Sequence, residues 1–347
     1  MGIHFWIKNW RCIESLSLNL SNVNVFIGKN STGKSSTIYG LYFLAKIAKG
    51  YDINNLAQNL YGLPIQDLIR SNGTKKYSPV EISIDDDGLV FTYDDKNKID
   101  IKKLPMATPW SDSFLLPSRR IGLFETANFL NKFLRYASKE ILSFAGFLVE
   151  LIRRFLVETP LLPPLPLFLS DYMRAIHGVE EKVEIKYTEK IGVLSIFKSP
   201  LLWMVEYYID DPFLSNVRMP LEGAPEGALD FLLIKPVLEK APERSLIVLE
   251  EPENNKNPTM QMELVKYLAE VSLKKNLTLV MTTHSEIVPL TLAKLVESRV
   301  ISKDDVKIYY LTRTIENPWT QAKMIEIYDD GSMDILPDSK ELTIKLF

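Results

Sequence analysis

The sequence predicts an α/β fold with a mixed central sheet, and three short segments carry that prediction. Each segment is an apolar run typical of a buried strand, and each ends in glycine or polar residues. The segments span residues 23–35, 245–253 and 277–285. Because ligands of open α/β sheets bind beyond the carboxyl ends of the strands, we expect these three ends to surround one ligand.

The first segment places a glycine-rich turn between a strand and a helix. Residues 28–35 spell G-x-x-x-x-G-K-S, after a strand predicted at 23–27 and before a helix predicted at 34–48. Glycine permits the turns that aim backbone N–H groups at a polyphosphate, at the positive end of the helix. Lys34 supplies a point charge and Ser35 a hydroxyl for magnesium. The residues expected to bind phosphate are Gly28, Lys29, Asn30, Ser31, Thr32, Gly33, Lys34, Ser35 and Ser36.

An antiparallel layer is expected around this motif. Alternating residues predict strands at 3–10 and 13–20 and a hairpin formed by 80–84 and 89–93. The acidic turn 85–88 has a carboxylate run like that of a calcium loop, but it lacks the remaining ligands. We therefore interpret it as a solvated turn.

The middle of the chain is expected to form an insert. Residues 125–177 follow a helical pattern that breaks at the proline-rich segment 159–166, interpreted as a rigid connector or, alternatively, as a ligand of a proline-recognition domain. Charges interrupt the most apolar run, 133–157, so it is too short to span a bilayer. We expect that run to pack in the core, or else against a partner or a membrane surface. Further strands are predicted at 183–187, 193–197 and 203–209.

This pattern divides the chain into two parts. One discontinuous domain is expected at residues 1–120 and 215–347, and a mainly helical insert with the proline-rich elbow at 121–214.

The second and third segments end in residues that carry chemistry. Glu250 and Glu251 end one apolar strand. Two carboxylates at the end of a buried strand are unusual without a nearby positive charge, so we interpret them as facing the phosphates and their cations. His284 ends the other strand and is placed to face a γ-phosphate. The alternatives are solvated acids at a strand end and an imidazole that only caps a helix.

Composition describes a folded chain with a large core. It is 46% hydrophobic and 24% charged with a net charge of −3, which disfavours nucleic acid held by bulk charge but leaves a local basic patch open. The single cysteine, Cys12, excludes an internal disulfide framework, and we expect it to pack in a strand region. With no visible signal peptide or spanning helix, a cytoplasmic location without membrane contact is expected.

The three segments, in this order, resemble the ATP-binding-cassette (ABC) ATPase heads of the RecF, SMC and overcoming-lysogenisation-defect (OLD) group, often grouped with AAA ATPases. Residues 7–14 look like the opening I-x-N-F-R-x-I strand of the family, 250–253 like its Walker B motif and 282–285 like its switch-histidine motif. Residues 116–120 are similar to a P-x-x-R element of these heads. The resemblance covers residues 1 to about 50 and 220 to 330.

The resemblance implies a P-loop fold of the ABC-ATPase type, with ATP and Mg²⁺ as ligands. Ser35 and Glu250 would hold magnesium, Glu251 would position the attacking water, and His284 would touch the γ-phosphate. Lys34 would act on the phosphates, and a second head would complete the site in a homodimer.

Several positions depart from the family pattern. The segment most similar to the trans-acting signature is 224–230, where Pro225 stands in place of the expected serine and offers neither a hydroxyl nor an N–H. Glu250 replaces the more usual aspartate, and Asn255 and Asn257 stand where the family has histidines.

Three functions stay open at this point. The first is a slow ATPase switch whose head dimerisation controls an effector, a nuclease or toxin, in antiviral defence. The second is a DNA-binding clamp in repair or chromosome maintenance, and the third is a nucleotide-binding module with little turnover. The last strands are predicted at 306–311 and 322–328, so we expect no room for a TOPRIM nuclease, and the insert lacks the heptads of a coiled-coil arm.

Overall fold

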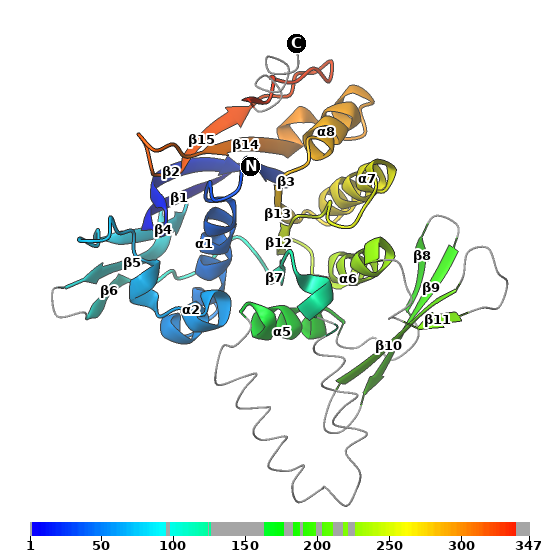
Figure 1. Ribbon diagram of the computed structural model, residues 1–347, viewed down its shortest axis with the longest axis horizontal. Helices are drawn as coiled ribbons and strands as arrows, with labels where there is room; N and C mark the ends of the chain where they lie inside the picture. The colour runs from blue at the N-terminus through cyan, green and yellow to red at the C-terminus, as the bar shows by residue number, and fades with distance from the viewer. Residues whose placement is uncertain are drawn as a thin grey trace, which may run out of the picture. The chain divides into compact units, whose positions relative to one another are not determined.

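The computed structural model describes most of the chain and divides it into two compact units. The described residues are 2–94, 98–123, 125, 163–176, 183–187, 190–198, 203–210, 218–220 and 226–337. The first unit comprises Met1–Ser118 and Ala241–Phe347, and the second comprises Arg119–Lys240 (Figure 1). The apolar run 133–157 and residues 159–162 of the proline-rich segment lie outside the described residues.

An antiparallel sheet of the first unit has the strand order β2-β1-β4-β5-β6. Its strands are β1 (Ile3–Trp10), β2 (Ile13–Leu20), β4 (Val80–Ile84), β5 (Asp87–Tyr93) and β6 (Ile99–Lys103). In β2 the apolar residues Leu16, Leu18 and Leu20 are buried and the residues between them are exposed, so the sheet has one core face. The predicted strands of this layer are confirmed, and β6 is an addition that the sequence pattern did not indicate.

The second sheet of this unit is mixed, as predicted, with the order β15-β14-β3-β13-β12-β7. Its strands are β3 (Val23–Ile27), β7 (Ser113–Leu116), β12 (Leu246–Glu250), β13 (Thr278–Thr283), β14 (Val306–Thr312) and β15 (Gln321–Ile325). Only the pairing of β14 with β15 is antiparallel. Strand β13 lies between β12 and β3, so the strand that ends in two glutamates is not the direct neighbour of the strand that leads into the glycine-rich loop.

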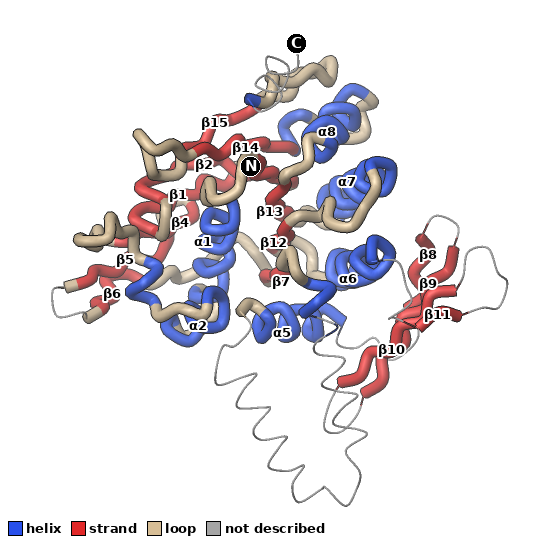
Figure 2. The backbone as a smooth tube through the Cα atoms, viewed as in Figure 1, coloured by secondary structure: helices blue, strands red, loops and turns tan. Residues whose placement is uncertain are grey.

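Helix α1 (Lys34–Ile47) lies between these two sheets and contacts strands of both (Figure 2). Every residue of α1 except Ser35 is buried, which explains why this helix has no polar face. Even Lys46 is buried, and its Nζ donates to the carbonyl of Ser113 at 3.1 Å. The other helical elements of the unit are α2 (Ile53–Tyr61), η1 (Ile65–Leu68), α7 (Pro258–Lys274), α8 (Ile287–Glu297) and η5 (Lys303–Asp305).

The described part of the second unit contains a short helical stretch at 120–123, two longer helices and a small sheet. The two longer helices are α5 (Leu165–Ile176) and α6 (Glu226–Lys240), which contact each other. The sheet is antiparallel in the order β11-β10-β9-β8, with β8 (Val183–Tyr187), β9 (Lys190–Lys198), β10 (Trp203–Asp210) and β11 (Arg218–Pro220). The unit boundary after α6 lies at Lys240, whereas the sequence-based division placed it at residue 214.

A buried ion pair joins two segments inside the second unit. The guanidinium of Arg120 contacts both carboxylate oxygens of Asp230, at 2.5 and 2.6 Å, and both side chains are almost fully buried. This pair fixes the start of the unit to α6, while Arg119 is exposed.

Among the described helices, none has the length and apolarity that a membrane crossing requires.

The first prediction concerns the buried centre of β12. Ile247 is 0% exposed, so its change to alanine should lower the free energy of unfolding by about 2–5 kcal/mol through lost burial and a cavity. Ile315, which is 97% exposed, offers the same chemical change at the surface and should cost less than about 0.5 kcal/mol. Urea denaturation of both variants measures the difference, and equal effects would contradict the packing of this sheet.

Candidate functional site

The glycine-rich loop after β3 adopts a backbone that only glycine permits at two positions. Gly28 has φ of 148° and Gly33 has φ of 102°. A Cβ on Gly28 would lie 2.3 Å from the carbonyl oxygen of Leu311, and one on Gly33 would lie 2.2 Å from Oγ1 of Thr320. The two glycines therefore let the loop pass against neighbouring segments while it turns into α1.

Lys34 holds this loop together from inside. The Lys34 side chain is buried, and its Nζ donates to the carbonyls of Gly28 at 2.7 Å and Lys29 at 2.8 Å. The hydroxyl of Thr32 also donates to the Lys29 carbonyl, at 2.8 Å. The loop is thus wrapped around an ammonium group at the N-terminus of α1, where the helix dipole is also positive.

A cavity of about 570 Å³ opens above the loop and α1. It is lined by Asn30, Ser31, Gly33, Lys34, Ser35 and Ser36 from the predicted loop, by Glu251 and His284, and by Arg11, Cys12, Leu63, Asp67, Ile69, Ser71, Arg313 and Trp319. Ser35, the one exposed residue of α1, faces this cavity. The structure therefore brings the loop, Glu251 and His284 to one space, and Glu250 is not among the residues that line it.

Parallel pairing explains why residues so far apart in sequence meet here. Glu250 pairs with Thr282 across β12 and β13, and Thr283 pairs with Ile27 across β13 and β3. The three strands therefore end at the same edge of the sheet, and the next residue of each strand points into the same region.

Glu251 and His284 form the acid and imidazole side of the cavity. The Nε2 atom of His284 lies 3.7 Å from Oε1 of Glu251, and the two side chains are about one third exposed. Asn254 donates through Nδ2 to Oε2 of Glu251 at 2.8 Å, and the backbone N–H of His284 donates to Oε1 of Glu253 at 2.7 Å. Glu251 has φ of 45°, a left-handed conformation that is strained for a side-chain-bearing residue and concentrates at functional sites.

Glu250 lies behind this surface in a more enclosed setting. Its Oε2 accepts the hydroxyl of Tyr39 at 2.7 Å and the backbone N–H of Ser118 at 3.3 Å. Burial, and next the nearby Glu250 carboxylate, raise the pKa of Tyr39 well above its ordinary value of 10.0. Tyr39 therefore stays neutral and keeps its proton available to Glu250.

The oxygen chemistry of these residues fits magnesium. Among the described residues there is no group of three or more His, Cys, Asp or Glu side chains arranged to hold a metal. Mg²⁺ needs no such cage, since it is commonly bound by one or two protein oxygens together with substrate phosphates and water. The Ser35 hydroxyl and the Glu250 carboxylate offer oxygen ligands of that kind.

Several residues of the site were not found from the sequence. Tyr39 and Asn254 contact the two glutamates, and the amide oxygen of Gln261 accepts the hydroxyl of Ser285 at 2.7 Å. No motif marks these residues, although Asn254 and Gln261 follow the glutamates closely. Cys12 was expected to pack in a strand region, but it lies in the turn after β1, where its Sγ contacts Ser36 at 3.6 Å.

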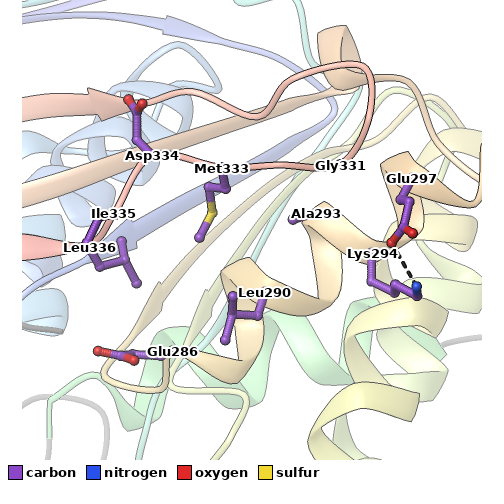
Figure 3. Close-up of a pocket in the computed structure, with 10 residues that line it drawn as sticks. All are labelled: Glu286, Leu290, Ala293, Lys294, Glu297, Gly331, Met333, Asp334, Ile335 and Leu336. Atoms are coloured by element: carbon purple, nitrogen blue, oxygen red, sulfur yellow. Dashed lines mark hydrogen bonds and ion pairs between the residues drawn. The ribbon is translucent and has the colours of Figure 1, made fainter. Parts of the chain in front are cut away.

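A second cavity of the same unit contains none of the predicted site residues. It measures about 340 Å³ and lies between α8 and the segment that follows β15, as Figure 3 shows. Its lining residues are Glu286, Leu290, Ala293, Lys294, Glu297, Gly331, Met333, Asp334, Ile335 and Leu336. The Lys294 ammonium is paired with Glu297 at 2.7 Å, and the rest of the lining combines apolar side chains with Glu286 and Asp334.

Residues 3–140 match the family model of the AAA ATPase domain. No curated protein matches the chain. Among solved structures, the chain is similar to an Smc head bound to the C-winged helix domain of ScpA, with 11% identity and a TM-score of 0.53 over 97% of this chain and 98% of that chain. An Smc head with an extended coiled coil bound to the C-terminal domain of ScpA, from Pyrococcus furiosus, has 11% identity and a TM-score of 0.48 over 99% and 98%. The SMC head from Thermotoga maritima has 10% identity and a TM-score of 0.46 over 94% and 100%.

The second prediction concerns the bond between Tyr39 and Glu250. Changing Tyr39 to phenylalanine leaves a buried carboxylate oxygen with one donor fewer and should lower the free energy of unfolding by about 1–3 kcal/mol near neutral pH. A raised pKa in the folded state means that the Tyr39 contribution is complete below a pH of about 10 and is lost as pH rises further. The gap between wild type and variant should therefore narrow in alkaline solution.

Urea denaturation at about pH 8 and about pH 11 measures this gap. Tyr51, which is 39% exposed, provides the control: its change to phenylalanine should have little effect on the free energy of unfolding at either pH. A gap for Tyr39→Phe that stays constant with pH would show that this hydroxyl is not held as the neutral donor.

Proposed function

We propose that this chain, which has the fold of an ABC-type ATPase head of the RecF/SMC group, binds ATP with Mg²⁺ and hydrolyses it slowly. The observation that carries the proposal is that Lys34, Glu251 and His284 line the same cavity. The match of residues 3–140 to the AAA ATPase domain supports the same activity.

The residues that line the cavity, and Glu250 with its partners behind them, have roles that suit their positions. The backbone of residues 28–36 cradles the phosphates at the N-terminus of α1, and Lys34 neutralises their charge. Ser35 and Glu250 would hold Mg²⁺, which would further neutralise the charge of the phosphate oxygens. Tyr39 and the Ser118 N–H fix the orientation of the Glu250 carboxylate.

Hydrolysis would take place on the glutamate side of the cavity. Glu251 orients and deprotonates the attacking water, and Asn254 keeps one carboxylate oxygen in place through its 2.8 Å bond. His284 contacts the γ-phosphate, where an imidazole N–H stabilises the charge of the transition state. The short segment 251–254 thus supplies both the base and the group that positions it.

We further propose that ATP pairs two heads and that this pairing controls a partner effector, a nuclease or toxin, in antiviral defence, as the OLD-like resemblance implies. The similar Smc head was solved with a domain of another protein bound to it, which supports a docking role for heads of this fold. The candidate signature segment 224–230 precedes and enters α6, which begins at Glu226; Pro225 itself lies outside the described residues.

A DNA-binding clamp is the second candidate, and the similarity of the fold to an Smc head favours it. In that case the closed pair of heads would hold duplex DNA by backbone contacts. A module that binds nucleotide with little turnover is a third candidate, suggested by the proline in the signature segment.

The third prediction tests the ATPase assignment. Lys34→Ala should abolish ATP binding, and Glu251→Gln should retain ATP while lowering kcat at least about 100-fold, because a general base is lost. The Glu251→Gln form should also self-associate in ATP. Phosphate release, ATP binding and sedimentation measure the three properties.

Matched controls come from an exposed ion pair on α7. Lys266→Ala and Glu270→Gln make the same changes at side chains that are 57% and 48% exposed, and both should hydrolyse ATP as the wild type does. Wild-type turnover in Lys34→Ala and Glu251→Gln would refute the assigned roles. Binding without turnover in the wild type would instead support the third candidate.

The fourth prediction separates an effector switch from a DNA clamp. A clamp should show hydrolysis that duplex DNA stimulates and that falls steeply with salt, because phosphate contacts release counterions. An effector switch should show no such stimulation and should retain a nuclease or toxin partner when purified from its own cell. ATPase rates over a salt series with and without duplex DNA make the comparison.

A further inference from the structure

The loop that joins β14 to β15 is attached to the glycine-rich loop by several contacts. Arg313 donates from its guanidinium to the carbonyl of Ser31 at 2.8 Å and to the carbonyl of Pro318 at 2.7 Å. The N–H of Thr320 donates to the carbonyl of Cys12 at 2.9 Å, and the Thr320 side chain occupies the space beside Gly33. Arg313 and Trp319, the residues of this loop that line the cavity, therefore belong to a loop that is attached to the glycine-rich loop.

Trp319 of the β14–β15 loop lines the cavity, and its indole ring is held in place by neighbouring side chains. The guanidinium carbon of Arg70 lies 4.5 Å from the Trp319 ring centroid and 3.7 Å from that of Tyr77, and the two rings are 6.3 Å apart at 76°. Arg70 is itself fixed by Asn9 and Glu14, each at 2.9 Å. The indole is thus oriented in advance by a cation–π contact and an edge contact.

The order of the strands places Trp319 on one side of the glycine-rich loop and the glutamates that follow β12 on the other side. Strands β14 and β13 flank β3 on opposite sides, so the β14–β15 loop and the ends of β13 and β12 lie on opposite sides of the loop that follows β3. A triphosphate that lies along this loop with its terminal phosphate at Glu251 and His284 therefore extends its other end toward Trp319. The apolar residues Leu63 and Ile69 also line the cavity.

We propose that Trp319 is the platform on which the base of the bound nucleotide stacks, and that this contact makes the site prefer purine over pyrimidine nucleoside triphosphates. The inference rests on the proposed binding of ATP at the glycine-rich loop. Stacking favours purines because their two fused rings cover more of the indole than a single ring does. The triphosphate is recognised by the loop, and the base is recognised by Trp319.

Binding of ATP and of inorganic tripolyphosphate to wild type, Trp319→Ala and Trp319→Phe tests the platform. Trp319→Ala should weaken ATP binding about tenfold and leave tripolyphosphate binding within about threefold of wild type, because only the stacked base is lost. Trp319→Phe keeps an aromatic face and should bind ATP within about threefold of wild type. The wild type should bind ATP more tightly than CTP, and Trp319→Ala should lose that preference.

Tryptophan fluorescence gives a second measurement that does not depend on the alanine variant folding. ATP should change the emission of the wild type and of Trp6→Phe, tripolyphosphate should not, and Trp319→Phe should lose the response to ATP. Equal ATP affinity in wild type and a folded Trp319→Ala, or an ATP response that survives in Trp319→Phe, would overturn the platform. Failure of the wild type to bind either ATP or tripolyphosphate would instead overturn the proposed nucleotide site.

Discussion

The in-register parallel pairing of β3, β13 and β12 is the constraint on which the site depends. It brings the glycine-rich loop, His284 and Glu251 to one edge although they come from three distant segments. A slip of one residue would move a strand end by about 3.3 Å and reverse the face to which each side chain points. The buried faces of these strands and the buried helix α1 resist such a slip. The packing that fixes the strand register therefore also fixes the positions of the site residues.

The loop itself combines conformational strain with dense hydrogen bonding. Ser31 and Glu251 have a left-handed backbone, which is strained for residues with a side chain, whereas Gly28 and Gly33 adopt a positive φ without that cost. The bonds from Lys34 to two loop carbonyls, and from the Glu251 N–H to the Thr282 carbonyl at 2.9 Å, offset that strain. Donors and charges that are fixed before a ligand arrives need little reorganisation when charge develops on a phosphate.

Polar contacts behind the cavity determine how the acids are presented. Glu250 is tied to α1 through Tyr39, whereas Glu251 is tied to its own segment through Asn254. The first contact joins the acid to the helix that carries Ser35, and the second leaves Glu251 on the cavity surface beside His284. Two adjacent glutamates thereby acquire different environments, in line with the different roles proposed for them, one as a metal ligand and the other as a base.

The sequence by itself determined the features that depend on neighbouring residues. Alternation predicted β1 and β2, apolar runs predicted β3, β12 and β13, and glycine spacing predicted the loop at 28–35, because these patterns act over a few residues. Only the tertiary structure decided that β13 lies between β12 and β3, that Tyr39 reaches Glu250 across 211 positions, and that Trp319 lies at the same cavity. Those contacts follow from the order in which distant strands pair, and no local pattern of residues specifies that order.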